Sequence, residues 1–145
     1  MFITFEGTGG SGKTTQIKEV YATLDSEGYD MLLTREPGGT DISNQIRTIL
    51  LENLDNQAMK ARAELLLFCA SRAQLVGEVI RPYLDKGGII LCDRYIDSTL
   101  AYQGYGHGTD LQALVDIHAL ALGSFAPDLT FILDIDPETG LERSD

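Results

Sequence analysis

Eight residues near the N-terminus constrain this chain more than any other feature. The segment Gly7-Thr8-Gly9-Gly10-Ser11-Gly12-Lys13-Thr14 has the spacing G-x-x-x-x-G-K-[ST], and Thr15 follows it. Glycines let the backbone wrap so that its N–H groups point inward at phosphate oxygens. Lys13 can then reach the terminal phosphates, and the Thr14 hydroxyl can ligate Mg²⁺. We therefore predict a site for ATP phosphates at residues 7–15.

The residues around this loop have the alternation that such a site requires. The apolar run at residues 2–5 predicts a buried strand before the loop. The spacing of Ile17, Val20, Tyr21 and Leu24 predicts a helix after it, which Gly28 would end. A bare flexible Gly/Ser loop is the alternative, and the flanking strand and helix make it the weaker interpretation. A helix placed here would also present its positive N-terminal end to the anion.

Strands and helices alternate along the rest of the chain. Further strands are predicted at residues 31–34, 89–92 and 129–134, and helices at residues 42–51, 58–84 and 110–122. This order implies βαβ units and a parallel, doubly wound sheet. We therefore predict an α/β chain with the three-layer P-loop NTPase fold, forming a single domain over residues 1–145.

Charge and composition exclude several classes of protein. Twenty-two acidic residues against 11 basic ones give a net charge of −11, which argues against a nucleic-acid surface. An anionic ligand is still possible where the few cations converge. No apolar run approaches the roughly 20 residues that span a bilayer, and the start resembles no signal peptide, so we expect a cytoplasmic protein without membrane contact. The two cysteines, Cys69 and Cys92, are interpreted as buried free thiols.

Charged residues beyond the loop suggest a metal and a second anionic ligand. Asp93 ends an apolar strand, where ligands bind at the carboxyl edge of such sheets. We predict that Asp93 and Thr14 both contribute oxygen ligands to Mg²⁺. The alternative is that Asp93 is only a polar residue at the end of a strand. Four arginines near predicted strand ends or on helix faces suit bidentate phosphate binding; they are Arg35, Arg47, Arg72 and Arg94. The chain has no Asn-Lys-x-Asp segment, which argues against a GTPase.

Several longer segments resemble bacterial thymidylate kinase, a P-loop nucleoside monophosphate kinase. They are Phe5-Glu6-Gly7, Thr34-Arg35-Glu36-Pro37-Gly38-Gly39-Thr40, Glu64-Leu65-Leu66-Leu67-Phe68, Ala70-Ser71-Arg72, Asp93-Arg94-Tyr95-Ile96-Asp97-Ser98-Thr99-Leu100-Ala101-Tyr102-Gln103-Gly104 and Pro127-Asp128-Leu129-Thr130. The resemblance covers essentially the whole chain. The segment that starts at Asp93 is the most specific, because nothing general about phosphate loops requires it.

The resemblance implies a role for each matching residue. Phe68 would stack on thymine and Arg72 would hydrogen-bond the base edge. Arg35 and Arg94 would hold the dTMP phosphate and, with Lys13, act in catalysis. The other implied substrate contacts are Arg47 near that phosphate, Glu36 near the phosphates or metal, and Ser98, Thr99, Tyr102 and Gln103 in the nucleoside pocket. The Glu36–Pro37 bond is a candidate for a cis peptide.

Three departures from the family pattern stand out. Gly9 occupies a loop position where the family commonly has an acid, and His107 a position where it commonly has arginine. The family also continues beyond Asp145 with an arginine-bearing lid, further helices and a last strand. We therefore expect this chain to be C-terminally incomplete.

The resemblance implies Mg²⁺-dependent transfer of the ATP γ-phosphoryl group to dTMP, giving ADP and dTDP for dTTP biosynthesis. It also implies a homodimer. Three alternatives stay open on the sequence: a kinase for another nucleoside monophosphate, a catalytically silent nucleotide-binding fragment, and a P-loop ATPase that drives motion.

Overall fold

The computed structural model describes residues 1–52 and 58–143. The chain forms two compact units, each assembled from separate stretches of sequence. The sheet unit consists of Met1–Arg35, Tyr83–Tyr95 and Pro127–Asp145. The helical unit consists of Glu36–Pro82 and Ile96–Ala126. Among the described residues, no helix combines the length and the apolar character needed to cross a bilayer.

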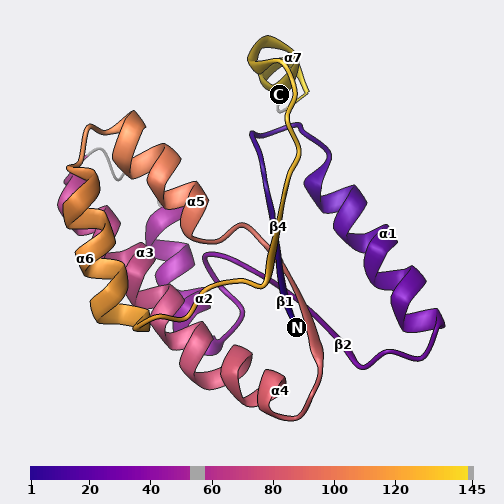
Figure 1. Ribbon diagram of the computed structural model, residues 1–145. Coiled ribbons are helices and arrows are strands. Elements are labelled where there is room, and N and C mark those ends of the chain that lie inside the picture. The colour runs from indigo at the N-terminus through magenta and orange to yellow at the C-terminus, as the bar shows by residue number, and fades with distance from the viewer. Residues whose placement is uncertain (53–57, 144–145) are drawn as a thin grey trace. The chain divides into compact units, whose positions relative to one another are not determined.

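A parallel sheet of four strands forms the centre of the sheet unit. The strands run in the order β2-β3-β1-β4, and every neighbouring pair is parallel. They are β1 (Phe2–Glu6), β2 (Met31–Arg35), β3 (Ile89–Asp93) and β4 (Leu129–Ile132). Figure 1 shows β1 and β4 running side by side. The predicted parallel α/β arrangement is confirmed, with β4 two residues shorter than the sequence predicts.

Helix α1 (Lys13–Ser26) follows β1 through the glycine-rich loop and packs on the sheet. The core beneath it consists of Ile3, Phe5, Ile17, Met31 and Leu91, with Val20, Tyr21 and Leu24 packed against it. This is the apolar helix face that the sequence predicts. The helix ends where Gly28 takes a left-handed φ of 89°, as expected of a glycine just beyond a helix C-terminus.

The described part of the helical unit contains helices and helical turns. These are α2 (Asp41–Arg47), the π-helical segments η1 (Thr48–Glu52), η2 (Val76–Ile80) and η3 (Leu100–Gly106), α3 (Ala61–Leu75), α5 (Ile96–Thr99) and α6 (Leu111–Leu122). Two short helices complete the described chain: α4 (Arg81–Asp85) and α7 (Pro137–Glu142), the latter in the sheet unit.

The long helix predicted at residues 58–84 is wrong in detail, because it begins at Ala61 and is divided into α3, η2 and α4. The helical segment at residues 96–106 was not predicted. Its aromatic residues, β-branched residues and glycines have weak helix propensity, and tertiary packing overrides such weak preferences.

Helices α3 and α6 pack together in the helical unit. Leu65 and Cys69 of α3 and Leu114 of α6 form their common core, which Leu100 and Ile117 extend. Asp110 caps α6 by accepting a hydrogen bond from Ala113 N at 3.0 Å, which fixes the start of this helix close to the predicted residue. This packing also brings together buried polar side chains of the two helices, Arg72 of α3 and His118 of α6.

Candidate functional site

The loop after β1 adopts conformations that only glycine takes readily. Gly7, Gly10 and Gly12 have φ values of 142°, 68° and 88°. A Cβ on Gly7 would lie 2.6 Å from the Leu133 carbonyl oxygen, which real side chains do not tolerate. The local sequence therefore determines the path of the loop, and that path leads directly into α1.

The N-terminus of α1 has no side-chain cap. Its N-cap residue is Gly12, and no acidic side chain lies in its first turn. By contrast, Thr40 caps α2 and Asp110 caps α6 through side-chain oxygens that accept backbone N–H groups. Uncapped N–H groups at a helix N-terminus attract anions, so this end of α1 can receive a phosphate.

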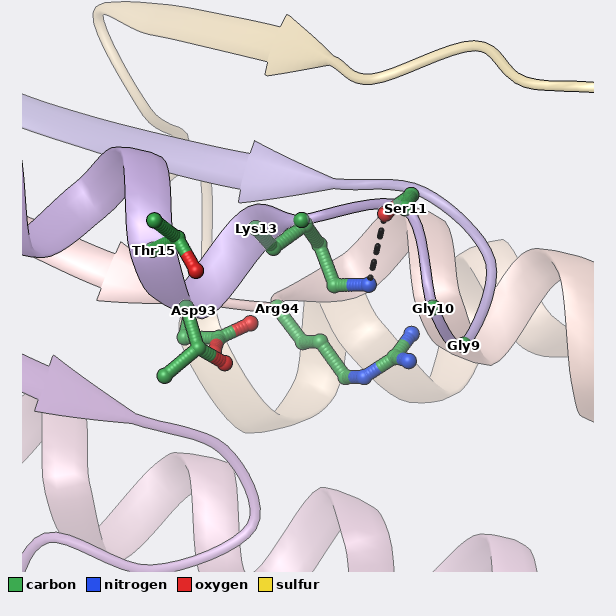
Figure 2. A pocket seen from close by; sticks show the side chains of 9 residues that line it. Gly9, Gly10, Ser11, Lys13, Thr15, Asp93 and Arg94 are labelled. Carbon is green, nitrogen blue, oxygen red and sulfur yellow. Dashed lines mark hydrogen bonds between the residues drawn. The ribbon is translucent and has the colours of Figure 1, made fainter. Parts of the chain in front are cut away.

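Lys13 lies against the loop that precedes it (Figure 2). Its Nζ donates hydrogen bonds to Gly7 O at 2.8 Å, Thr8 O at 2.6 Å and Ser11 Oγ at 3.2 Å. Burial lowers the pKa of Lys13 and the nearby Arg94 adds to this, while the Asp93 carboxylate opposes it. A phosphate entering the loop would offer this ammonium stronger, charged acceptors than the carbonyls it now contacts.

Asp93 and Thr14 form the metal-side corner of the site. Thr14 Oγ1 donates to Asp93 Oδ2 at 3.1 Å. Asp93 Oδ1 is buried and has no hydrogen-bond partner within the described chain. Across residues 1–52 and 58–143, no cluster of three His, Cys, Asp or Glu side chains could hold a metal by protein ligands alone. Mg²⁺ commonly uses one or two carboxylates with waters and phosphates, so this donor pair fits it.

Arg94 completes the cavity beside the loop. Its φ of 70° is left-handed, and its backbone N donates to Phe5 O at 2.9 Å. Its Nη1 donates to Gly7 O at 3.2 Å, so the guanidinium lies near Lys13 (Figure 2). The cavity has a volume of about 360 Å³ and is lined by Gly9, Gly10, Ser11, Gly12, Lys13, Thr14, Thr15, Asp93 and Arg94. The structure thus brings the predicted phosphate-loop and metal residues together.

Arg35 is the last residue of β2 and is exposed. Its Cα is paired with that of Asp93 in the neighbouring strand. The backbone therefore places Arg35 at the same carboxyl edge of the sheet as the loop.

Helix α7 packs against the phosphate loop, and this contact was not predicted from the sequence. Asp136 caps α7 by accepting from Thr139 N at 3.2 Å, and Pro137 occupies its first turn. Gly140 is buried against the loop, where an added Cβ would lie 3.0 Å from both Gly9 O and Thr8 Oγ1. A side chain at residue 140 would therefore press on the phosphate loop, which would have to give by a few tenths of an ångström.

In the helical unit, Arg72 is the centre of a buried polar network. Only 2% of the residue is exposed. Its Nε forms an ion pair with Glu36 Oε2 at 2.6 Å, and its Nη2 donates to Thr99 Oγ1 at 3.1 Å. Three predicted substrate residues, Glu36, Arg72 and Thr99, are therefore in direct contact. The predicted position of Glu36 near phosphates or metal stays a prediction.

His118 of α6 is the fourth member of this network. Its Nε2 lies 2.6 Å from Arg72 Nη1, and its Nδ1 lies 2.6 Å from Leu114 O. Burial lowers the pKa of His118, and the positive charge of Arg72 lowers it further. The imidazole is consequently neutral at physiological pH.

The segment that carries Glu36 is anchored by hydroxyl groups. The Glu36–Pro37 bond is cis, as the sequence analysis proposed. Ser71 Oγ accepts from Gly38 N at 3.3 Å, and Ser43 Oγ donates to Ser71 O at 2.8 Å. Arg47 is directed at this segment as well, since its Nη1 donates to Pro37 O at 2.8 Å.

The remaining predicted substrate residues lie on α3, α5 and η3. Phe68 is half-buried and precedes Arg72 by four residues, so the two share one face of α3. Gln103 is buried and donates to Glu64 Oε1 at 2.6 Å. Ser98 is half-buried, and Tyr102 is 50% exposed.

Sequence reasoning missed His118, Gly140 and Glu6 as residues of these sites. Glu6 is buried, and its Oε1 accepts from Tyr95 N at 2.6 Å, which holds the chain just after Arg94. A signal for His118 was present, because it recurs with Leu114 and Leu122 on the buried face of α6. A polar residue on an apolar helix face needs a buried partner.

Comparisons with known proteins agree with the resemblance found in the sequence, and they cover nearly the whole chain. A family model described as thymidylate kinase matches residues 5–145. The thymidylate kinase of Roseiflexus castenholzii is 58% identical over 143 residues, which cover 99% of this chain and 62% of that protein. The thymidylate kinase of Herpetosiphon aurantiacus is 55% identical, over 99% of this chain and 60% of that protein. The chain thus spans about six tenths of the length of these relatives.

A solved structure is similar as well. The crystal structure of thymidylate kinase from Ehrlichia chaffeensis has a TM-score of 0.86 and 43% sequence identity to this chain. The match covers 99% of this chain and 81% of that one.

Proposed function

The chain belongs to the thymidylate kinase family, and from this premise we propose that it transfers the γ-phosphoryl group of ATP to dTMP, giving ADP and dTDP. The observation that carries the proposal is the cavity beside the phosphate loop. It combines loop glycines with left-handed φ values, a buried lysine and a carboxylate with a buried oxygen that has no hydrogen-bond partner within the described chain.

The donor nucleotide is proposed to bind in the sheet unit. Backbone N–H groups of residues 7–15 and the uncapped end of α1 would hold its phosphates. Lys13 would exchange its bonds to Gly7 and Thr8 for bonds to phosphate oxygens. Arg94, which lies in the same cavity, would neutralise charge that develops during transfer, and Arg35 is proposed to assist it at the same sheet edge.

A magnesium ion is proposed at the Thr14 and Asp93 corner of this site. The buried Asp93 Oδ1 and the Thr14 hydroxyl are suitable oxygen donors for it, directly or through water. When bound, the ion would supply positive charge next to the phosphates.

The acceptor nucleotide is proposed to bind in the helical unit. Phe68 would stack on the thymine ring, and Arg72, one helical turn away, would hydrogen-bond its edge. Arg47 is proposed to lie near the dTMP phosphate. Ser98, Thr99, Tyr102 and Gln103 are proposed to line the nucleoside pocket, with Glu36 fixing Arg72. Because the acceptor phosphate is already an anion, the transfer needs no strong general base, and positioning with charge neutralisation suffices.

A coupled assay of ADP release with and without dTMP tests this function. We expect release that depends on dTMP, ATP and Mg²⁺ together. Hydrolysis of ATP at the same rate without dTMP would instead identify an ATPase. Binding of ATP without turnover would identify a silent nucleotide-binding chain. Competition by dUMP, dCMP and dGMP would identify a kinase for another nucleoside monophosphate.

Membership of the family is also the basis for proposals about domain organisation, location and oligomeric state. We propose that residues 1–145 act as one kinase domain, in the cytoplasm, and that two copies pair. Exposed apolar side chains on the helical unit support pairing: Leu66 of α3 is 55% exposed, and Val115 and Leu120 of α6 are 55% and 87% exposed. Light scattering coupled to size-exclusion chromatography tests it, and a monomer at high protein concentration would contradict it.

A further inference from the structure

The surroundings of Arg72 determine how its guanidinium is oriented. A buried guanidinium is stable only where its N–H groups meet acceptors. Glu36 accepts from Nε and Thr99 accepts from Nη2, while Nη1 meets His118 Nε2 at 2.6 Å. These contacts come from separate parts of the helical unit, so together they restrict rotation of the guanidinium plane.

The second contact of His118 decides which ring nitrogen carries the proton. Leu114 O, 2.6 Å from Nδ1, can only accept, so the proton lies on Nδ1. In a neutral ring Nε2 is then an acceptor, which is what the donor Arg72 Nη1 requires. Because α6 residues Leu114 and His118 are four apart, the helix itself sets this tautomer.

We propose that His118 is a positioning residue for base recognition: as a neutral Nδ1–H tautomer, it accepts from Arg72 and holds the guanidinium in the orientation that binds the thymine edge. This inference rests on the proposed function, in which Arg72 contacts the base of dTMP. His118 itself is not assigned any contact with the nucleotide.

Protonation of His118 would remove this effect. A proton on Nε2 would place a donor and a second positive charge against the Arg72 guanidinium. Of the charged groups in the described chain, Arg72 contacts the ring, and Glu36 is the ion-pair partner of Arg72 at Nε. Cys69 of α3 also faces Arg72, but burial raises the pKa of its thiol, so it stays neutral. Asp116, on the same helix as His118, is exposed. Acidification is therefore expected to loosen Arg72 through His118.

Calorimetry of dTMP binding to the full chain tests the proposal with two variants. His118→Leu removes the acceptor at similar volume and should weaken dTMP binding by about tenfold or more. His118→Gln keeps an acceptor at the Nε2 position and should stay within about threefold of wild type. ATP affinity and the thermal unfolding midpoint verify that both variants are folded. Equal dTMP affinity in wild type and His118→Leu, or equal loss in both variants, would overturn the proposal.

The pH dependence separates positioning from packing. The dTMP phosphate titrates in the same way in every variant, so the ratio of wild-type to His118→Gln affinity reports the histidine alone. This ratio should fall when the pH is lowered from about 7.5 to about 5.5. A ratio that is constant with pH would contradict the role of the neutral ring.

Nitrogen NMR of the imidazole provides a measurement that needs no ligand. At neutral pH the His118 ring should be uncharged with its proton on Nδ1. A charged ring, or a proton on Nε2, would overturn the positioning role even if dTMP binds. Conversely, wild-type protein that has the expected tautomer but binds no dTMP would overturn the proposed function, and positioning for the base with it.

Discussion

The phosphate loop of the sheet unit and the Arg72 network of the helical unit hold buried cations in different ways. Lys13 donates to the carbonyl groups and the hydroxyl group of its own loop, and the nearby Asp93 Oδ1 has no partner within the described chain. Arg72 instead contacts Glu36, Thr99 and His118, which come from distant parts of the sequence.

For the ligands proposed above, this difference corresponds to two modes of binding. The loop can release local contacts and receive stronger ones from an entering anion. The contacts of Arg72 to Glu36, Thr99 and His118 are formed without any ligand, so the contribution proposed for this network is a fixed orientation of the guanidinium. Removing a residue of the loop should therefore affect catalysis more than folding, whereas removing a residue of the network should affect both.

The largest effect is expected for Lys13→Ala. The loss of the ammonium should lower dTMP-dependent ADP release by about a thousandfold, because charge that develops on the transferring group is no longer neutralised. The free energy of unfolding should change by less than about 1 kcal/mol, since only local contacts are lost. Coupled kinetics and urea unfolding measure the two quantities. A large loss of stability with little loss of turnover would invert the comparison.

Arg72→Ala is expected to have the next largest effect, and on both properties. The variant leaves the buried Glu36 carboxylate without its ion-pair partner, at a cost of about 3 kcal/mol in the free energy of unfolding. Urea unfolding should detect this loss, and calorimetry should detect weaker dTMP binding. The double variant Arg72→Met with Glu36→Gln should recover most of the stability but not the dTMP affinity. Normal dTMP affinity in Arg72→Ala would exclude the base-edge role.

Asp93→Asn should act on the metal alone. The amide keeps an acceptor for Thr14 but loses the negative charge. Mg²⁺ affinity should fall by about tenfold to a hundredfold, so that turnover at low Mg²⁺ is lost and partly recovers at high Mg²⁺. Titration of activity against Mg²⁺ measures this. An unchanged Mg²⁺ requirement would assign Asp93 a structural role only.

Gly140→Ala tests whether α7 maintains the shape of the loop. The added methyl group would lie 3.0 Å from Gly9 O and Thr8 Oγ1, so the loop must shift. ATP affinity should fall by about fivefold, or about 1 kcal/mol. Gly77→Ala is the matched control, because a Cβ there meets nothing within 4 Å. Equal ATP affinity in the two variants would show that α7 does not constrain the loop.

The smallest effect is expected on stability as the pH falls. The pKa of His118 is lower in the folded chain than its usual 6.5 in the unfolded chain. The unfolded chain therefore binds this proton first, and the contribution of His118 to stability is present above 6.5 and lost as the pH falls toward the folded pKa. Urea unfolding of wild type and His118→Gln across this range should show a steeper decline in wild type.

The two regions also differ in how far the sequence predicts them. The phosphate loop was predicted residue by residue, because its chemistry depends on glycines, Lys13 and Thr14 within one short segment. Asp93 was predicted from its place at a strand end, and parallel strands bring such ends to one edge. The sheet order itself, β2-β3-β1-β4, depends on long-range pairing that no local pattern contains.

The Arg72 network was predicted only in part. The family resemblance identified Glu36, Arg72 and Thr99, but it did not indicate that they contact one another. His118 was missed because its role depends on the packing of α6 against α3, which is decided by Leu65, Cys69 and Leu114 together. The π-helical segments η1 and η2 were missed as well, since they interrupt a continuous helical pattern without a distinct residue signature.

The left-handed backbone of Arg94 has a consequence for mutagenesis. Most residues with a Cβ disfavour a φ of 70°, whereas glycine, which has no Cβ, and asparagine, whose short polar side chain can bond locally, adopt it more readily. Replacing Arg94 with asparagine would thus relieve the main chain while deleting the guanidinium. In this variant the backbone strain would decrease while turnover falls. A loss of turnover could then be attributed to the missing guanidinium and not to a destabilised fold.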